Sequence, residues 1–531
     1  MTCAEVPSTV EQAEIARGPV ARAAGLLGAG NMLSRILGLV REMTIAYFFG
    51  ASGAASIFTL AQLVPNFLYD LLIGGQLSAA LVPVLSEYTS ARRKDEFWQV
   101  ASVVLTVAAT VLAGVVLLVE LSAPWIIRLT GGGLPPLLQR QAVGLLRLMM
   151  PALVFLGLSG ALTGVLYALR RFLFPALATS VLNAGVILAV LLFARRLGIA
   201  AAALGVILGA SLQVLVQLPG LRGARLRPRF SLSHPALRKI LRLYGPVVLG
   251  VVIGMVGSVI DRRLASGTGE HSIAWMRYAT TLIQTPLGLV AAAVSLAVLP
   301  AMSRADSEGD RRSYEATLAL GIRLILTLVI PATAGLLSLG RPIVALIFER
   351  GEFTAYDTEI VTRALNLYLI GLPFAALDQV LIFAFYARKN TLLPNLVQAY
   401  AIAIYLLFAL PFVRSWGFLA LVIANSAQWT WHTVLMALLV RRHIGWPAGQ
   451  KIGQTLWRAT LAAAVMATAA RASVQVLTSA LGPTGSTARL AVVGAAVVGA
   501  GLIYLGLASL LRLEEVTILW RSLSRRFRHT R

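Results

Sequence analysis

The sequence predicts an all-α polytopic membrane protein with about 14 transmembrane helices. We expect two six-helix lobes around a central cavity, plus two extra C-terminal helices. The first observation is composition: 58% of the 531 residues are hydrophobic and only 13% are charged, whereas soluble proteins carry roughly 25% charged residues. The second is a series of apolar runs of about 20 residues, the length that spans a bilayer as a helix. The third is an internal repeat. Helices follow because hydrocarbon leaves no outside partner for backbone N–H and C=O groups.

Fourteen apolar segments can be followed along the chain. Several exceed the bilayer thickness and are expected to tilt or to extend beyond it. The predicted spans are 24–48, 54–86, 98–128, 142–168, 173–195, 198–220, 239–263, 272–302, 314–340, 357–387, 391–413, 417–440, 452–477 and 488–511.

The repeat relates two sets of six spans. Tyr167 precedes Pro175 by eight residues, and Tyr386 precedes Pro394 by the same spacing, 219 residues later. The segment LVPVLS at 81–86 similarly recurs as VLPAMS at 298–303. An even number of spans per copy makes the repeats parallel, an arrangement known from alternating-access transporters. The predicted organisation is a disordered tail (1–20), an N-lobe (21–220), a basic linker (221–238), a C-lobe (239–441), spans 13 and 14 (452–511) and a basic tail (512–531).

Charge sets the expected orientation. The net charge is +24, and most Lys and Arg residues fall in the tails and in alternate loops. By the positive-inside rule, both termini are cytoplasmic and the protein lies in the inner, or plasma, membrane. No basic stripe with interleaved aromatic residues appears, so nucleic acid is not an expected partner. Residues 1–20 lack an apolar h-region, so no cleavable signal peptide is expected.

Polar residues in the first span are the main candidates for a binding site. Ser34, Arg41 and Glu42 lie near one helical face, and Arg35 lies on the side of Glu42. Arginines inside a membrane helix cost about 2.5–3.5 kcal/mol each, and a guanidinium binds phosphate through two parallel hydrogen bonds. These four residues are therefore predicted to bind an anionic substrate. The alternative is snorkelling to an interface or a structural Arg41–Glu42 pair.

Further candidates lie in spans two and eight. Arg277, early in span eight, either adds to the same cavity from the second lobe or anchors the helix beside Trp275. Pro65-Asn66 and Gly74-Gly75 interrupt span two. A broken helix beside a cavity is where binding and gating motions concentrate, although a kink tolerated for packing is an equal alternative.

Other functional classes find less support. Acidic residues in the spans are few (Glu42, Asp70, Glu120, Asp261 and Asp378), which disfavours an antiporter of organic cations. The five histidines are scattered, mostly in predicted loops, and the single cysteine is Cys3. No metal-binding spacing, nucleotide loop or nucleophile elbow is present. The sequence thus predicts a transporter without a cofactor or metal, not an enzyme.

Several motifs resemble the MurJ/MviN family of lipid II flippases. The amino-terminal signature is similar at SRILG (34–38) with Arg41-Glu42, at FGA (49–51), at Pro65-Asn66 and at LSAALVP (77–83). Later similarities are FERGEFTAYD (348–357) and FYARKNT (385–391) followed by Pro394. The resemblance covers residues 22–510, and the order of the motifs is specific.

The resemblance implies a fourteen-helix member of the multidrug/oligosaccharidyl-lipid/polysaccharide exporter superfamily. It implies movement of an undecaprenyl-pyrophosphate-linked peptidoglycan precursor to the outer leaflet, with Arg35 and Arg41 meeting the pyrophosphate and spans 13 and 14 forming a groove for the lipid tail. Membrane lipids and cell-wall synthesis proteins are the implied further partners. Charges usual in the family are replaced here at Ser56, Tyr69, Gly74, Thr281 and Gln284. A flippase for another lipid-linked glycan and a non-transporting scaffold remain the alternatives.

Overall fold

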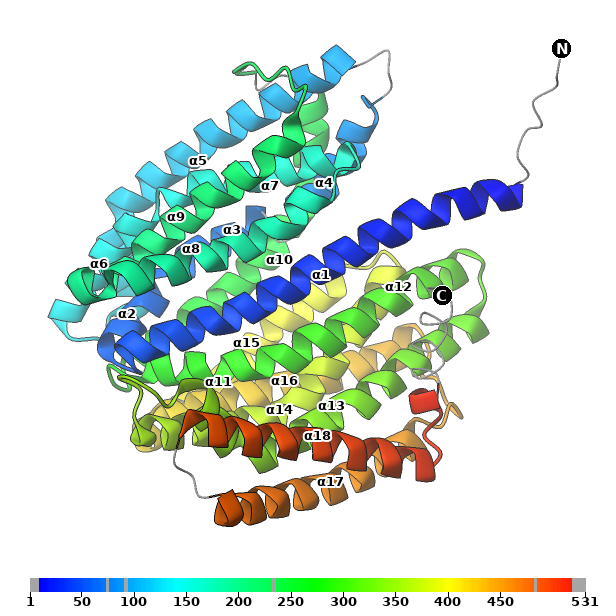
Figure 1. Cartoon of the computed structure of the whole chain (residues 1–531). Coiled ribbons are helices and arrows are strands. Elements are labelled where there is room, and N and C mark those ends of the chain that lie inside the picture. Colours follow the sequence, from blue (N-terminus) through cyan, green and yellow to red (C-terminus); the bar gives the residue numbers. More distant parts are fainter. Residues whose placement is uncertain are drawn as a thin grey trace. The chain divides into compact units, whose positions relative to one another are not determined.

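The structure is a computed structural model that describes residues 9–72, 76–89, 94–231, 233, 235–481 and 485–517. These residues form helices and connecting turns, without strands (Figure 1). Ten helices or helix pairs in the described part are long and apolar enough to cross a membrane. The predicted class, an all-α polytopic membrane protein, is confirmed. The chain forms two compact units, Met1–Val259 and Ile260–Arg531, whose boundary falls within one helix.

The first unit contains spans one to six. Its helices are α1 (Thr9–Phe49), α2 (Gly53–Ala61), α3 (Leu63–Leu72), α4 (Gln76–Ser86), α5 (Lys94–Gly131), α6 (Pro136–Met149), α7 (Ala152–Ala168), α8 (Leu173–Leu197) and α9 (Ala200–Gln217), followed by the 3₁₀ turn η2 (Leu218–Leu221). Helix α10 (Pro235–Ser266) continues into the second unit. The start of α1 at Thr9 lies within the segment predicted as a tail.

The second unit contains the remaining spans. Its elements are α11 (Ser272–Pro286), the π-helical turn η3 (Leu287–Ala291), α12 (Ala292–Ser307), α13 (Arg311–Phe348), α14 (Ala355–Ala387), α15 (Leu392–Trp416), α16 (Phe418–His443), α17 (Ile452–Leu481) and α18 (Ser486–Leu510). All fourteen predicted spans coincide with helices, some of them divided.

Proline explains two of the divisions, because it cannot donate the hydrogen bond that continues a helix. Span four ends one helix at Met149 and restarts at Ala152, with Pro151 between. Span eight changes to π-helix directly after Pro286. Span two restarts at Leu63, which places Pro65 in the first turn of α3, where its missing N–H costs little.

The internal repeat is visible in the backbone of the two units. Gly198 and Gly417, 219 residues apart, have φ values of 56° and 57° at equivalent helix junctions. Arg170 and Lys389, also 219 apart, both have φ of 58°. Each follows a helix whose last carbonyls accept hydrogen bonds in the pattern of a Schellman cap. Since non-glycine residues rarely adopt positive φ, this match is specific to the repeat.

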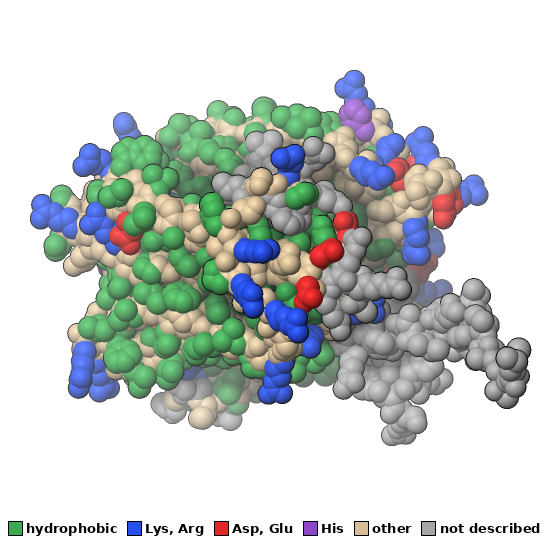
Figure 2. Space-filling view, turned by 90° about the horizontal axis from the view of Figure 1, so that it is seen from above, with side chains coloured by type: hydrophobic (Ala, Val, Ile, Leu, Met, Phe, Trp, Pro, Cys, Tyr) green, Lys and Arg blue, Asp and Glu red, His purple; other side chains and the backbone are tan. Residues whose placement is uncertain are grey.

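The surface is as apolar as a bilayer requires. Figure 2 shows hydrophobic side chains over broad continuous areas of one face. On α5, Leu117, Leu118 and Leu121 are 64%, 65% and 81% exposed. Such areas far exceed the apolar patches of soluble proteins, and they are explained by contact with lipid tails.

The two C-terminal helices are fastened to α13 by an ionic cluster. Figure 1 shows α17 and α18 side by side along that helix. Arg323 of α13 bonds Glu515, which is buried, and Glu514 at 2.8 Å, while Lys451 reaches Glu514 at 2.7 Å. The hydrogen bonds from Lys451 and Arg323 lower the pKa of Glu514 to about 2.

Replacing Glu515 with alanine should detach this cluster. Arg323 is only 12% exposed, and losing one member of a buried pair costs about 3 kcal/mol because the other charge is left uncompensated. We expect a lower unfolding temperature in nanodiscs, followed by tryptophan fluorescence. Glu514→Gln, at a fully exposed carboxylate, should have a clearly smaller effect. Equal losses in the two variants would contradict the assignment.

The lowered pKa of Glu514 also has a consequence for pH. A carboxyl group whose folded pKa lies below its unfolded value contributes stability above the unfolded value, and loses it as pH falls through the folded pKa. Glu514 should therefore add its full contribution at any pH above about 5, and lose it toward pH 2. Unfolding temperatures of the parent and Glu514→Gln, compared from pH 3 to 8, should converge only at the acid end.

Candidate functional site

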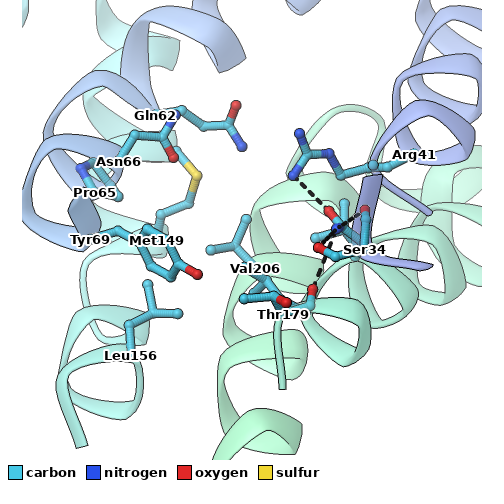
Figure 3. Close-up of a pocket in the computed structure, with 14 residues that line it drawn as sticks. Ser34, Arg41, Gln62, Pro65, Asn66, Tyr69, Met149, Leu156, Thr179 and Val206 are labelled. Atoms are coloured by element: carbon cyan, nitrogen blue, oxygen red, sulfur yellow. Dashed lines mark hydrogen bonds between the residues drawn. The ribbon is translucent and has the colours of Figure 1, made fainter. Parts of the chain in front are cut away.

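A polar pocket of about 280 Å³ lies inside the first unit (Figure 3). Its wall combines polar side chains of α1, α3 and α8 with apolar side chains of α6, α7 and α9. Such a mixture suits a ligand that carries polar and apolar parts. The lining residues are Ser34, Gly38, Arg41, Gln62, Pro65, Asn66, Tyr69, Met149, Leu156, Thr179, Leu182, Asn183, Val186 and Val206.

Arg41 is held in a fixed orientation at this wall. Its Nη2 and Nε donate to Glu42 Oε1 at 2.7 and 3.2 Å, and its Nη1 donates to Asn183 Oδ1 at 3.0 Å. Glu42 is buried, whereas the Arg41 side chain is 23% exposed. A guanidinium has five N–H donors, so these bonds leave some of them available to an anion in the pocket. The predicted pair thus serves both interpretations, because it is structural and faces the pocket.

Asn183 of α8 connects this arginine to Ser34. Its Nδ2 donates to Ser34 O at 3.1 Å and lies 3.4 Å from Ser34 Oγ. The same side chain therefore accepts from one α1 residue and donates to another two turns away. In hydrocarbon such an interhelical contact fixes the register of two helices, because alternative partners are scarce.

Small residues allow α1 and α8 to approach closely enough for this contact. Gly30, Ser34 and Gly38 are spaced four apart and share one face of α1. A Cβ built on Gly30 would lie 2.3 Å from Ala176 O, so only glycine fits there. Ser180 Oγ adds a hydrogen bond to Gly30 O at 3.3 Å. This is the small-residue packing typical of membrane helices.

The opposite wall of the pocket comes from the broken second span. In Figure 3, Gln62, Asn66 and Tyr69 lie on one side of the pocket, and Arg41 and Ser34 lie on the other. Gln62 caps the end of α2, and its Oε1 is buried without a hydrogen-bond partner among the described residues. An unpaired buried amide is costly, which makes it a candidate contact for a ligand.

The other predicted site residues have different positions. Arg35 is half-buried and does not line the pocket; its Nε is buried without a hydrogen-bond partner in the described part of the chain. Arg277 is half-buried on α11 in the second unit, where its carbonyl accepts bonds from the Thr280 and Thr281 hydroxyls. Gly74 and Gly75 lie outside the described residues. Within the described ranges, no cluster of three His, Cys, Asp or Glu side chains could hold a metal ion.

Sequence reasoning missed Asn183 and Gln62. Each is a polar residue inside an apolar run, and that was the available signal: a buried amide in a membrane helix needs a partner. The partner of Asn183 lies 142 residues away, and no local pattern identifies it.

The bond from Asn183 to Arg41 can be tested with Asn183→Leu, which keeps the side-chain volume. We expect a loss of about 1 kcal/mol in stability and a loss of ligand binding in the pocket, because the guanidinium is no longer aimed. Ser180→Ala is the matched control, since it removes a neighbouring α8–α1 bond that does not touch Arg41. Thermal unfolding and lipid binding by the purified protein are the measurements. Similar binding losses in the two variants would assign Asn183 to packing alone.

Comparison with known proteins places these features in context. A family profile described as "Lipid II flippase MurJ" matches residues 45–493. The "Lipid II flippase MurJ" of Burkholderia cenocepacia is 33% identical over 374 residues, covering 68% of this chain and 72% of that protein. The "Probable lipid II flippase MurJ" of Rhizobium meliloti is 30% identical and covers 83% of this chain and 84% of its own length.

Solved structures agree on the fold. One described as "Lipid II flippase MurJ, inward closed conformation" has a TM-score of 0.76 and 24% identity, covering 94% of this chain and 99% of that one. An inward-facing multidrug resistance MATE family transporter of the MOP superfamily has a TM-score of 0.69 and 14% identity, covering 77% of this chain and 94% of that one. At these identities the likeness concerns the fold.

Proposed function

The chain belongs to the MurJ family of lipid II flippases, and from this membership we propose that it moves a polyprenyl-pyrophosphate-linked peptidoglycan precursor across the cell membrane. The proposed direction is from the cytoplasmic to the outer leaflet. The protein acts as a transporter and not as an enzyme, with both termini in the cytoplasm. Cell-wall synthesis proteins are its proposed protein partners.

The observation that carries the proposal is the Arg41 guanidinium at the wall of a polar pocket between membrane helices. A diphosphate loses its solvation on entering hydrocarbon, which costs many kcal/mol unless donors replace the water. Arginine supplies two parallel N–H donors that match phosphate oxygens. A pocket of about 280 Å³ holds a diphosphate and part of a sugar, whereas the polyprenyl tail has no need of a polar site and stays in the lipid.

The two-unit repeat supports an alternating-access cycle. In transporters built from parallel repeats, the units rock around a fixed site, so that it opens to one side of the membrane at a time. The Arg41 network lies within one unit and joins α1 to α8, so rocking need not break it. The same guanidinium can therefore hold the headgroup throughout its passage.

Purified protein in phosphatidylethanolamine–phosphatidylglycerol vesicles tests the proposal. Fluorescent lipid II is placed in one leaflet, and its headgroup is scored by accessibility to an impermeant quencher. We expect faster exchange between leaflets with the protein than in empty vesicles. A polyprenyl-pyrophosphate carrying an exopolysaccharide unit, tested in parallel, separates the two glycan classes. No exchange of either lipid, together with failure to restore growth of cells depleted of their lipid II flippase, would favour a non-transporting scaffold.

A further inference from the structure

A histidine and an aspartate form a buried pair in the second unit, away from the pocket. His432 of α16 and Asp378 of α14 approach at 2.7 Å between Nδ1 and Oδ1. Their side chains are only 4% and 16% exposed. Both residues lie well inside helices predicted to cross the membrane. The expectation that the histidines sit mostly in loops overlooked this one, whose helix places it in the interior.

The contact between α14 and α16 does not depend on this pair. Ser426 Oγ donates to Leu367 O at 2.7 Å, and Thr433 Oγ1 donates to Phe374 O at 2.8 Å. A Cβ on Gly371 would lie 2.8 Å from Ser426 Cα, so the two backbones are already in close contact. These neutral bonds and the close packing hold the interface, so the costly ionisable pair needs another explanation.

The internal repeat supplies a comparison within the same chain. Subtracting the repeat offset of 219 from Asp378 and His432 gives Ser159 and Gln213, both uncharged. In that interface of the first unit, between α7 and α9, the polar contact is between neutral groups: Gln217 Nε2 donates to Ser159 Oγ at 2.6 Å. The same helix packing is therefore achieved without ionisable residues, and the His–Asp pair is particular to the second unit.

The chemistry of the pair suits one exchangeable proton. With an ionised Asp378 and a neutral imidazole the pair carries one negative charge; one added proton makes it neutral overall. His432 Nε2 is buried and has no hydrogen-bond partner in the described part of the chain, so no acceptor or donor there fixes the ring in one state. Buried His and Asp groups in membrane proteins commonly form proton relays for this reason.

The surrounding helices offer no described cation that would keep Asp378 permanently ionised. Tyr386 on α14 is within electrostatic range of Asp378. Arg277 on α11 lies at the level where Trp275 bonds Asp357, and Asp378 is 21 residues further along α14, about 30 Å at 1.5 Å per residue. The other titratable groups of the packed helices have partners of their own: Tyr314 with Ala384 O on α13, Tyr405 with Asp261 on α15, Asp306 of α12 with Arg388, and Arg323 with Glu514 and Glu515.

We propose that Asp378 and His432 form a proton-binding site inside the second unit, and that its occupation is coupled to the transport cycle. The coupling rests on the proposed function; the binding of the proton does not. One proton is taken up and released per cycle, and the pair changes between net negative and neutral. Because a buried net charge and a neutral pair prefer different degrees of hydration, the two states favour different arrangements of the second unit.

Proton binding is tested first, without substrate, on the full chain in nanodiscs. Infrared difference spectra between acid and alkaline pH should contain a carboxyl band that is absent from Asp378→Asn and displaced along the pH axis in His432→Gln. Ser426→Ala and Thr433→Val are the controls, because each removes a neutral α16–α14 bond of the same interface. They should retain the band. A band that persists in Asp378→Asn, or its absence from the parent, would overturn the site.

Coupling is tested in vesicles with the membrane potential held at zero by potassium and valinomycin. A gradient of one pH unit should drive accumulation of the lipid in one leaflet by up to about tenfold when one proton is coupled. The parent and both controls should show this, whereas Asp378→Asn and His432→Gln should only equilibrate the lipid. A parent that equilibrates lipid but ignores the gradient refutes coupling and leaves the proposed function standing. A parent that moves no lipid refutes the proposed function, and the infrared result still decides the proton site.

Discussion

Arg41→Lys should lower lipid transport by about tenfold or more, although the charge is kept. The ammonium cannot bond Glu42 Oε1 through two nitrogens and Asn183 through a third, as the guanidinium does. It also lacks the planar fork that matches a phosphate. A charged hydrogen bond contributes about 1.5–3 kcal/mol, and 1.4 kcal/mol is a factor of ten. The measurement is leaflet exchange of fluorescent lipid II at equal protein density.

A second variant separates transport from folding. Arg41→Ala alone would leave the buried Glu42 carboxylate without its cation, which is destabilising by about 3–5 kcal/mol. The double change Arg41→Gln with Glu42→Gln removes both charges together and keeps amides that can hydrogen-bond. We expect this variant to fold, to lose lipid binding and to stop transport.

Arg147 and Glu120 provide a matched control in the same unit. They also form an arginine–glutamate contact, at 4.0 Å between α6 and α5, but neither lines the pocket. Arg147→Gln with Glu120→Gln should transport as the parent does. If the Arg41 double variant also transports normally, the guanidinium is structural and the substrate binds elsewhere, with Arg35 and Arg277 the next residues to test.

Much of the fold follows from the sequence, because the bilayer restricts the choices. Each apolar run of sufficient length must be a helix, and all fourteen predicted spans contain one. The repeat was also readable, since Gly198 and Gly417 mark positions where the backbone needs positive φ. The divisions were less predictable: a proline such as Pro331 is accommodated within α13, whereas Pro151 separates two helices. Which outcome occurs depends on packing around the freed carbonyl.

The site was predictable in part. Arg41 stands out because an arginine in an apolar helix is costly, and it does line a pocket. Its partner Asn183 and the pairing of His432 with Asp378 depend on contacts between distant helices. Periodicity indicates which face of a helix is polar, but it does not say which other helix meets that face. The histidine was overlooked because scattered single residues were judged by spacing along the chain and not by depth in the membrane.

The tight contact of α1 with α8 is the second feature on which the pocket depends, and Gly30→Leu should disrupt it. A Cβ at this position would meet Ala176 O at 2.3 Å and Ala176 Cβ at 2.9 Å. Neither backbone atoms nor a Cβ can move aside, so α1 must shift away from α8. Asn183 would then lose Ser34 and Arg41 together. We expect a destabilisation of about 1–3 kcal/mol and transport near the background of empty vesicles.

Gly28→Leu is the control for this change, because a Cβ at Gly28 meets nothing within 4 Å. Both substitutions replace glycine by leucine in α1, so both gain the same helix propensity, and any difference between them reports the contact with α8. Unfolding temperature in nanodiscs and leaflet exchange of fluorescent lipid II are measured for the two variants and the parent. Gly28→Leu should match or exceed the parent in stability and transport at the parent rate. Equal loss of transport in both variants would show that α1 tolerates no added bulk on either face, and that the α1–α8 contact does not specifically support the Arg41 network.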